Sequence, residues 1–303
     1  MTIVLTGGAG FIGSTLAREL LGTGHTVVVI DRRAPLFTHE HLYFINCDLV
    51  TSSLPYNVLE RTDAVIHLVG TTIARKWTDQ VKEDIRHSRV ESTKRVVESI
   101  MGATNRPPVF ICASAIGFYG DTGEEVANEQ SAHGEGFLAE VVAEWEAEAR
   151  KATEAGVRVV LLRTAPVLGN GGIIDMVTKT ARFGFLMSIT KKDFWFSWIH
   201  QSDIVRAYLF ALETNTLQGV VNASAPEPVQ WSVFMSTIAH ALKRRIIGTV
   251  PEYIAKKMFG GFFDEMTKST QVLPGRLIDK GFVFQYSTLQ SAIDSLIPHE
   301  KNR

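Results

Sequence analysis

Apolar positions in the first half of the chain follow two alternating periods. Short apolar runs, typical of strands buried on both faces, are separated by longer stretches in which apolar residues recur every third or fourth position. The strand-like runs are residues 3–5, 26–30, 43–45, 63–69, 109–113 and 157–162. The helical stretches are residues 11–21, 79–101 and 137–152. Strands that alternate with helices predict an α/β fold, a doubly wound parallel sheet with right-handed crossovers.

The alternation breaks near residue 164. A glycine-rich turn follows at residues 169–172, and an aromatic cluster occupies residues 194–198. We therefore expect a sheet domain over residues 1–164, to which the chain returns at about residues 200–223. A smaller, mostly helical lobe is expected over residues 165–303.

Composition narrows the class of protein without deciding its chemistry. The chain has 303 residues, 45% of them hydrophobic and 21% charged, which is typical of a globular protein with a large core. A net charge of −1 gives no reason to expect nucleic acid or a membrane surface as a partner. No apolar stretch is long enough to span a membrane, and the N-terminus enters a strand at once, so we expect a cytoplasmic protein without a signal peptide. No spacing of His, Cys or Asp predicts a metal site.

The turn after the first strand carries the main functional signal. The string TGGAGFIG at residues 6–13 joins this strand to the first helical stretch. Such a turn presents backbone N–H groups and the positive end of a helix dipole, which together bind a diphosphate. The second strand ends at Asp31, 18 positions after Gly13, near the spacing at which an acidic residue meets an adenosine ribose. The sequence therefore predicts a dinucleotide site, with its diphosphate at Gly7, Gly10, Phe11, Ile12 and Gly13.

Motifs at the strand ends resemble the extended short-chain dehydrogenases/reductases, the superfamily of nucleotide-sugar epimerases and dehydratases. These motifs are the glycine string, DAVIHL at residues 63–68 and SAIGFYG at residues 114–120. Further markers are similar to a subgroup labelled epimerase family proteins: KWT at 76–78, SRV at 88–90, FLAEV at 137–141, SWIH at 197–200 and NASAP at 222–226. Residues 271–282 look like that subgroup's C-terminal domain of unknown function, so the resemblance covers nearly the whole chain.

The resemblance implies a Rossmann domain with a substrate-side lobe, and an oxidoreductase-like or epimerase-like protein that uses NADP(H) on an unassigned small molecule. It also implies that two copies can form a homodimer through a helical bundle. Asp48, after the third strand, contacts the adenine in related folds, although a simple turn residue is an equal alternative. Leu68 and Gly70, after the fourth strand, are expected beneath the cofactor, where glycine allows close approach.

The end of the second strand bears on the choice of dinucleotide. Asp31 can accept hydrogen bonds from a free ribose 2′-OH and would repel a 2′-phosphate, which favours NAD. Arg32 and Arg33 favour NADP, because a guanidinium offers paired donors to a phosphate, although a solvated surface charge is an equal alternative for Arg33. The subgroup usually has Ser-Arg here, so this chain retains the arginine and replaces the serine. We expect NADP, with NAD as the alternative.

The usual catalytic pair of the superfamily is missing. Short-chain dehydrogenases use a tyrosine, and a lysine four residues later that lowers the tyrosine pKa and holds the nicotinamide ribose. The corresponding helix, residues 137–146, contains neither residue type. Phe137 or Leu138 stands at the tyrosine position, and Val141 or Val142 stands at the lysine position.

Other polar residues near the strand ends are candidates for the chemistry. Ser114 follows the fifth strand and could face the nicotinamide, although a loop or capping hydroxyl is the alternative. Tyr119 could replace the missing phenol, although a packing role is common for this tyrosine. Lys76 and Arg89 follow the fourth strand on the ligand side and could hold an anionic group of the substrate.

Two functions are therefore open. In the first, the protein transfers hydride between NADP(H) and an unidentified carbonyl or sugar-like substrate, without the usual Tyr-Lys pair. In the alternative, it binds the dinucleotide without catalysis, as a redox sensor or an interaction protein. Fold alone does not distinguish between them, because function depends on the site.

Overall fold

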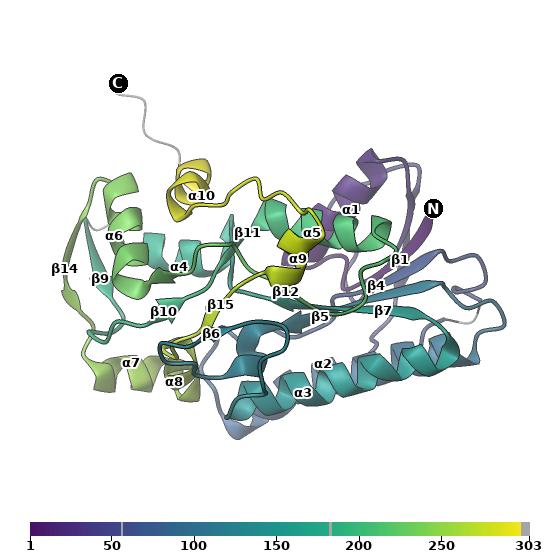
Figure 1. Cartoon of the computed structure of the whole chain (residues 1–303), viewed down its shortest axis with the longest axis horizontal. Coiled ribbons are helices and arrows are strands. Elements are labelled where there is room, and N and C mark those ends of the chain that lie inside the picture. Colours follow the sequence, from purple (N-terminus) through teal and green to yellow (C-terminus); the bar gives the residue numbers. More distant parts are fainter. Residues whose placement is uncertain (56, 182–183, 298–303) are drawn as a thin grey trace.

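A parallel sheet of seven strands forms the centre of the computed structural model, which describes residues 1–55, 57–181 and 184–297 (Figure 1). The spatial order is β12 (Gly219–Ala223), β7 (Arg158–Thr164), β5 (Val109–Ala115), β4 (Ala64–His67), β1 (Thr2–Thr6), β2 (Thr26–Asp31) and β3 (Leu42–Asn46). All neighbouring pairs are parallel. The chain order reverses between β1 and β4, and ligands bind at such a reversal, beyond the carboxyl ends of the strands.

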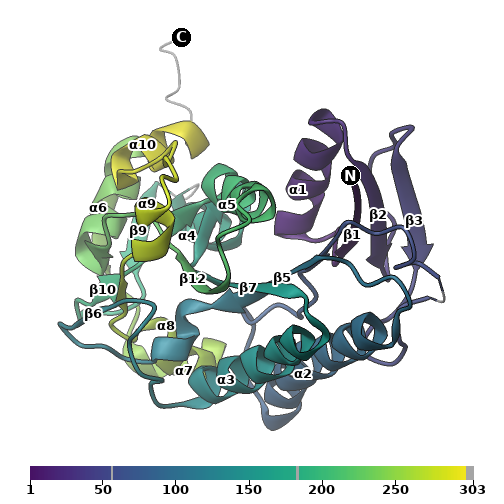
Figure 2. The same ribbon diagram turned by 45° about the vertical axis from the view of Figure 1, so that its right-hand side comes forward.

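Helices cover both faces of the sheet (Figure 2). On one side lie α1 (Phe11–Gly22) and α5 (Gln201–Glu213), and on the other α2 (Asp79–Gly102) and α3 (Phe137–Arg150). Successive strand residues point to opposite faces, so Leu5 packs in the first layer while Val4 packs in the second. The predicted doubly wound parallel sheet is confirmed.

A smaller lobe, green to yellow in Figure 1, extends beyond the sheet. Its helices are α4 (Gly172–Ala181), α6 (Trp231–Ala241), α7 (Glu252–Phe259), α8 (Gly261–Met266) and α10 (Leu289–Leu296). It also contains paired short strands, β8 (Val167–Gly169) with β11 (Ile199–His200), β9 (Phe185–Ser188) with β14 (Arg245–Thr249), and β10 (Trp195–Phe196) with β13 (Val229–Gln230). The expectation of a mostly helical lobe missed these strands because most are too short to show a period of two. The lobe has a core of its own around Trp198, Trp231 and Phe234.

The lobe and the sheet domain share chain segments. After β11 the chain returns to the sheet as α5 and β12, and β12 pairs with β7. Near the C-terminus, β15 (Gln271–Val272) pairs with β6 (Val126–Ala127), and α9 (Gly275–Asp279) lies against β12. Two short 3-10 helices, η1 (Ile116–Tyr119) and η2 (Lys151–Ala155), follow β5 and α3.

Candidate dinucleotide site

The glycine turn forms a close-packed backbone cradle between β1 and α1. Gly7 has a positive φ of 74°, and a Cβ there would lie 2.8 Å from the carbonyl carbon of Leu68. A Cβ on Gly13 would overlap the carbonyl oxygen of Gly7, so this glycine allows the helix to approach the strand. A Cβ on Gly10 would meet only the Gly7 oxygen, at 3.2 Å, and is otherwise open. The open side of Gly10 gives a diphosphate room to reach the backbone.

The first turn of α1 has no acidic residue, and no side chain caps the helix, whose N-cap residue is Gly10. The only carboxylate that the described contacts place near this end is that of Asp31, which accepts the N–H of Ala9, just before the helix. The orphan N–H groups of the first turn are therefore left for a ligand. The Phe11 carbonyl accepts a hydrogen bond from Gln201 of α5 at 3.0 Å, which holds the start of α1 against the returning helix. The residues present at this turn fit a bound diphosphate.

Asp31 ties the end of β2 to the glycine turn. Its Oδ2 accepts a hydrogen bond from the Ala9 N–H at 3.1 Å, and its Oδ1 accepts one from the Arg33 N–H at 3.2 Å. Arg32 is exposed, and its Nη1 lies 3.7 Å from Oδ2 of Asp48. Asp48 also accepts a hydrogen bond from the backbone N–H of Val50 at 3.0 Å, so it closes a turn after β3. Both oxygens of Asp31 are therefore used by the backbone, while the Arg32 guanidinium is in reach of a ligand.

Arg89 of α2 reaches the loop after β4. Its Cζ lies 3.2 Å from where a Cβ of Gly70 would be, so Gly70 makes room for the guanidinium. The guanidinium donates to the carbonyl oxygens of Ile85 and Thr71, at 3.2 and 3.1 Å. Burial lowers the pKa of Arg89 to about 10, which leaves the group charged at neutral pH. Within residues 1–55, 57–181 and 184–297, no carboxylate forms an ion pair with it.

Lys76 is exposed and lies against the lobe. Its Cγ is 3.5 Å from where a Cβ of Gly260 would be, at the turn between α7 and α8. The adjacent Trp77 donates its backbone N–H to the Phe259 carbonyl, at 3.2 Å. The two predicted substrate contacts thus differ in setting, since Arg89 lies at the strand ends and Lys76 at the contact between α2 and the lobe.

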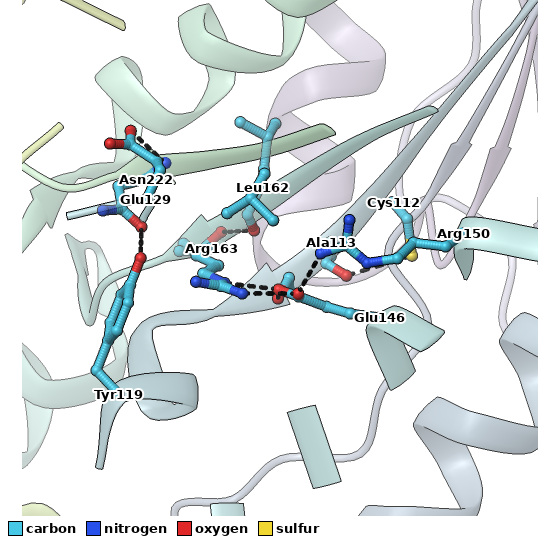
Figure 3. Close-up of polar contacts among 12 residues, drawn as sticks. Cys112, Ala113, Tyr119, Glu129, Glu146, Arg150, Leu162, Arg163 and Asn222 are labelled. Atoms are coloured by element: carbon cyan, nitrogen blue, oxygen red, sulfur yellow. Dashed lines mark hydrogen bonds and ion pairs between the residues drawn. The ribbon is translucent and has the colours of Figure 1, made fainter. Parts of the chain in front are cut away.

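The two hydroxyls predicted to be catalytic are engaged inside the protein. Ser114 is 4% exposed and donates to Oε1 of Glu146 at 2.6 Å. Tyr119 is 3% exposed and donates to Oδ1 of Asn222 at 2.7 Å (Figure 3). Burial raises the pKa of Tyr119 above its ordinary value, farther from neutrality. The structure does not present either hydroxyl to a ligand in the crevice.

A buried carboxylate that the sequence analysis missed organises this region. Glu146 of α3 accepts hydrogen bonds from Nε and Nη2 of Arg163, at 2.7 and 2.8 Å, and both residues are about 3% exposed or less (Figure 3). With the Ser114 hydroxyl, Arg150 at 3.1 Å brings the donors to Glu146 to four, and the Arg163 guanidinium stacks 3.4 Å from the centre of the Phe118 ring. The signal was present in the sequence, because Glu146 falls on the apolar face of its helix and Arg163 directly follows an apolar run.

No group of His, Cys, Asp or Glu in the described part of the chain could hold a metal ion. None of the described helices is long and apolar enough to cross a membrane.

Comparison with known proteins agrees with this architecture. The model of the NAD dependent epimerase/dehydratase family matches residues 3–224, and that of a domain of unknown function matches residues 250–296. The epimerase family protein YfhF of Bacillus subtilis is 32% identical over 99% of both chains. The chloroplastic epimerase family protein SDR39U1 homolog of Arabidopsis thaliana is 32% identical over 98% of this chain and 87% of its own.

The crystal structure of human epimerase family protein SDR39U1 (isoform 2) with NADPH superposes with a TM-score of 0.87 at 27% identity. The superposition covers 98% of this chain and 99% of the human one. Because the first family model spans more than half of the chain and the relatives match it almost end to end, this protein belongs to the NAD dependent epimerase/dehydratase family, among the epimerase family proteins that carry the C-terminal domain of unknown function.

Proposed function

We propose that this protein binds NADP(H) and transfers hydride between it and a small carbonyl or sugar-like substrate. The observation that carries the proposal is the glycine cradle with its open face at Gly10, next to the exposed guanidinium of Arg32. Asp31 accepts hydrogen bonds from two backbone N–H groups, whose dipoles partly offset the negative charge of its carboxylate beside the ribose. The similar human protein, which was crystallised with NADPH, supports the same choice.

Each residue of the site has a distinct task in this proposal. The turn from Gly7 to Gly13 holds the diphosphate, and Arg32 pairs with the 2′-phosphate of the adenosine ribose. Leu68 and Gly70 lie beneath the cofactor, whose nicotinamide supplies the hydride chemistry when it is bound. Reduction of the substrate carbonyl also requires a proton at its oxygen, which in this proposal comes from a bound water or from a donor other than the usual tyrosine. A catalytic role for Ser114 or Tyr119 would require the hydroxyl to leave Glu146 or Asn222, and it stays a prediction.

The cofactor preference is tested by calorimetric titration with NADPH and NADH. We expect NADPH to bind at least about tenfold more tightly, because a guanidinium–phosphate pair is worth roughly 1.5–3 kcal/mol. Arg32→Ala should remove most of that preference and leave NADH binding unchanged. Arg61→Ala is the matched control, since Arg61 is exposed and precedes β4, at the opposite end of the strands from the site. Tighter binding of NADH by the natural chain would contradict the proposal.

The second candidate function, a non-catalytic redox sensor or interaction protein, is favoured by the missing Tyr-Lys pair and the two engaged hydroxyls. Oxidation of bound NADPH is measured against a panel of carbonyl compounds and nucleotide sugars. Stoichiometric binding with no turnover on any of them would favour the sensor. If turnover is found, unchanged rates in Ser114→Ala and Tyr119→Phe would exclude both hydroxyls from the chemistry.

A further inference from the structure

The crevice between β1 and β4 divides the site into two halves. The residues assigned to the adenosine half, Asp31, Arg32 and Asp48, follow β2 and β3 on one side of the glycine turn. Gly70 follows β4 on the other side, where the sheet continues to β5 and β7. A dinucleotide whose diphosphate lies at the glycine turn extends its nicotinamide half toward this second side.

On that second side, Arg89 is a cation with N–H groups that its two hydrogen bonds do not use. A guanidinium has five N–H groups, and two of those of Arg89 are used by the carbonyl oxygens of Ile85 and Thr71. These bonds hold the group next to Gly70, with no carboxylate of the described chain to neutralise it. A partly buried charge of this kind is costly unless a ligand completes its surroundings.

The same guanidinium lies near a residue of α3 that is one helical turn from the position of the missing lysine. Val141 and Val142, at the lysine position of α3, are buried at 0% and 2% exposure. Trp145 follows Val141 by one helical turn and therefore shares its face. The Arg89 Cζ lies 5.6 Å from the centre of the Trp145 ring. A residue of α2 thus brings a positive charge close to the face of α3 on which the lysine is missing.

We propose that Arg89 is the cationic residue that holds the nicotinamide half of the bound dinucleotide, by donating hydrogen bonds to the hydroxyls of the nicotinamide ribose. It takes over the ribose-holding task of the lysine that is absent from α3. This assignment replaces the expectation that Arg89 holds an anionic group of the substrate, and it rests on the proposed binding of NADP(H).

Calorimetric titrations with two ligands distinguish the contributions of the two halves of the site to binding. The ligands are NADPH and adenosine 2′,5′-bisphosphate, which lacks the nicotinamide ribose. Arg89→Gln should weaken NADPH binding by about tenfold or more and leave the bisphosphate affinity within about twofold. Arg89→Lys retains the charge, so its affinity for NADPH should fall less than that of Arg89→Gln. Arg86→Gln is the matched control, because Arg86 lies on the same helix and pairs with Glu140 and Glu144; both affinities should be unchanged.

Unchanged NADPH affinity in Arg89→Gln would overturn the assignment, and so would an equal loss for both ligands. Failure of the natural chain to bind either ligand would instead overturn the proposed function. If the Arg89 variants do not fold, the natural chain is treated with phenylglyoxal, which modifies arginine, and Arg89 is followed by mass spectrometry. NADPH should protect Arg89 and the bisphosphate should not; absence of protection by NADPH would also overturn the assignment.

Discussion

Glycines of one motif have different physical roles at the residue scale. Gly10 has a φ of −78°, which any residue can adopt, and the space around its outer side is open. Gly13 has no such space, because a side chain there would overlap the carbonyl oxygen of Gly7. The first glycine therefore leaves room for a ligand, and the second allows the packing of α1 on β1.

Substitution by alanine should separate these two roles. Gly10→Ala should weaken NADPH binding by about tenfold or more, since its methyl group lies in the path of the diphosphate, and should change the melting temperature little. Gly13→Ala should lower the free energy of unfolding by about 1–3 kcal/mol, as overpacking does. Thermal denaturation and calorimetric titration of both variants measure these effects. Equal losses of stability, or full NADPH affinity in Gly10→Ala, would show that the roles are not divided in this way.

The direction in which a side chain points is harder to obtain from the sequence. Ser114 and Tyr119 were correctly located near the end of β5, but their partners, Glu146 and Asn222, lie 32 and 103 residues away in the chain. In the sheet, Ser114 and Asn222 are both register partners of Arg163. Only the parallel register brings these polar residues together, and it leaves the hydroxyls of Ser114 and Tyr119 hydrogen-bonded inside the protein.

At the element scale, a buried histidine connects β1, β4 and α2. His67 is completely buried, with its Nδ1 2.6 Å from the Thr6 hydroxyl and its Nε2 3.2 Å from the Ser92 hydroxyl. On the next turn of α2 toward its N-terminus, the Ser88 hydroxyl accepts the backbone N–H of Thr71 at 3.1 Å. These bonds fix the start of the glycine turn and the loop after β4 to one helix, directly beneath the crevice.

This link should make the stability of the protein depend on pH. Burial lowers the pKa of His67 to about 3, from 6.5 in a free side chain. Between these values the unfolded chain binds a proton that the folded chain does not, so stability falls as the pH is lowered below about 6.5. Between pH 7 and pH 5, the free energy of unfolding of the natural chain should therefore fall by about 2 kcal/mol.

Urea unfolding at the two pH values tests the effect, with His67→Gln as the control that cannot titrate. The natural chain should lose about 2 kcal/mol more between pH 7 and pH 5 than the variant does. The other titratable groups are the same in both proteins, so their contributions to the change in the free energy of unfolding largely cancel. A difference below about 0.5 kcal/mol would show that His67 is protonated in the folded state.

At the scale of the whole molecule, the C-terminal segment joins both cores. Val272, Leu277 and Phe282 pack in the layer between the sheet and its helices α1 and α5. Leu289 and Ile293 pack in the core of the lobe. Between these two groups, the fully buried carboxylate of Asp203 accepts the backbone N–H groups of residues 285 and 286, at 2.7 and 2.9 Å. The region that matches a domain of unknown function therefore does not form a separate structural unit.

A chain that ends at residue 269 should consequently fail to fold cooperatively. Each buried apolar side chain that is lost contributes about 1.5–3 kcal/mol, and several of them together reach the total stability of a typical domain. We expect no sharp thermal transition by circular dichroism, and aggregation in size-exclusion chromatography. Val283→Ser, which changes an exposed side chain of the same segment, should shift the melting temperature by less than about 2 °C. A sharp transition in the shortened chain would mean that the sheet domain is stable alone.

The sequence by itself determined the class of fold and the position of the glycine turn, and it predicted a dinucleotide site there. These features are local: the apolar period sets which face of an element is buried, and glycine spacing sets how closely two backbones approach. The tertiary structure alone decided that Ser114 faces Glu146, that Asp31 is held by the glycine turn, and that Arg89 lies beside Gly70. Such contacts depend on strand register and helix packing between distant parts of the chain, and hydrophobic periodicity carries no information about which polar side chains will meet.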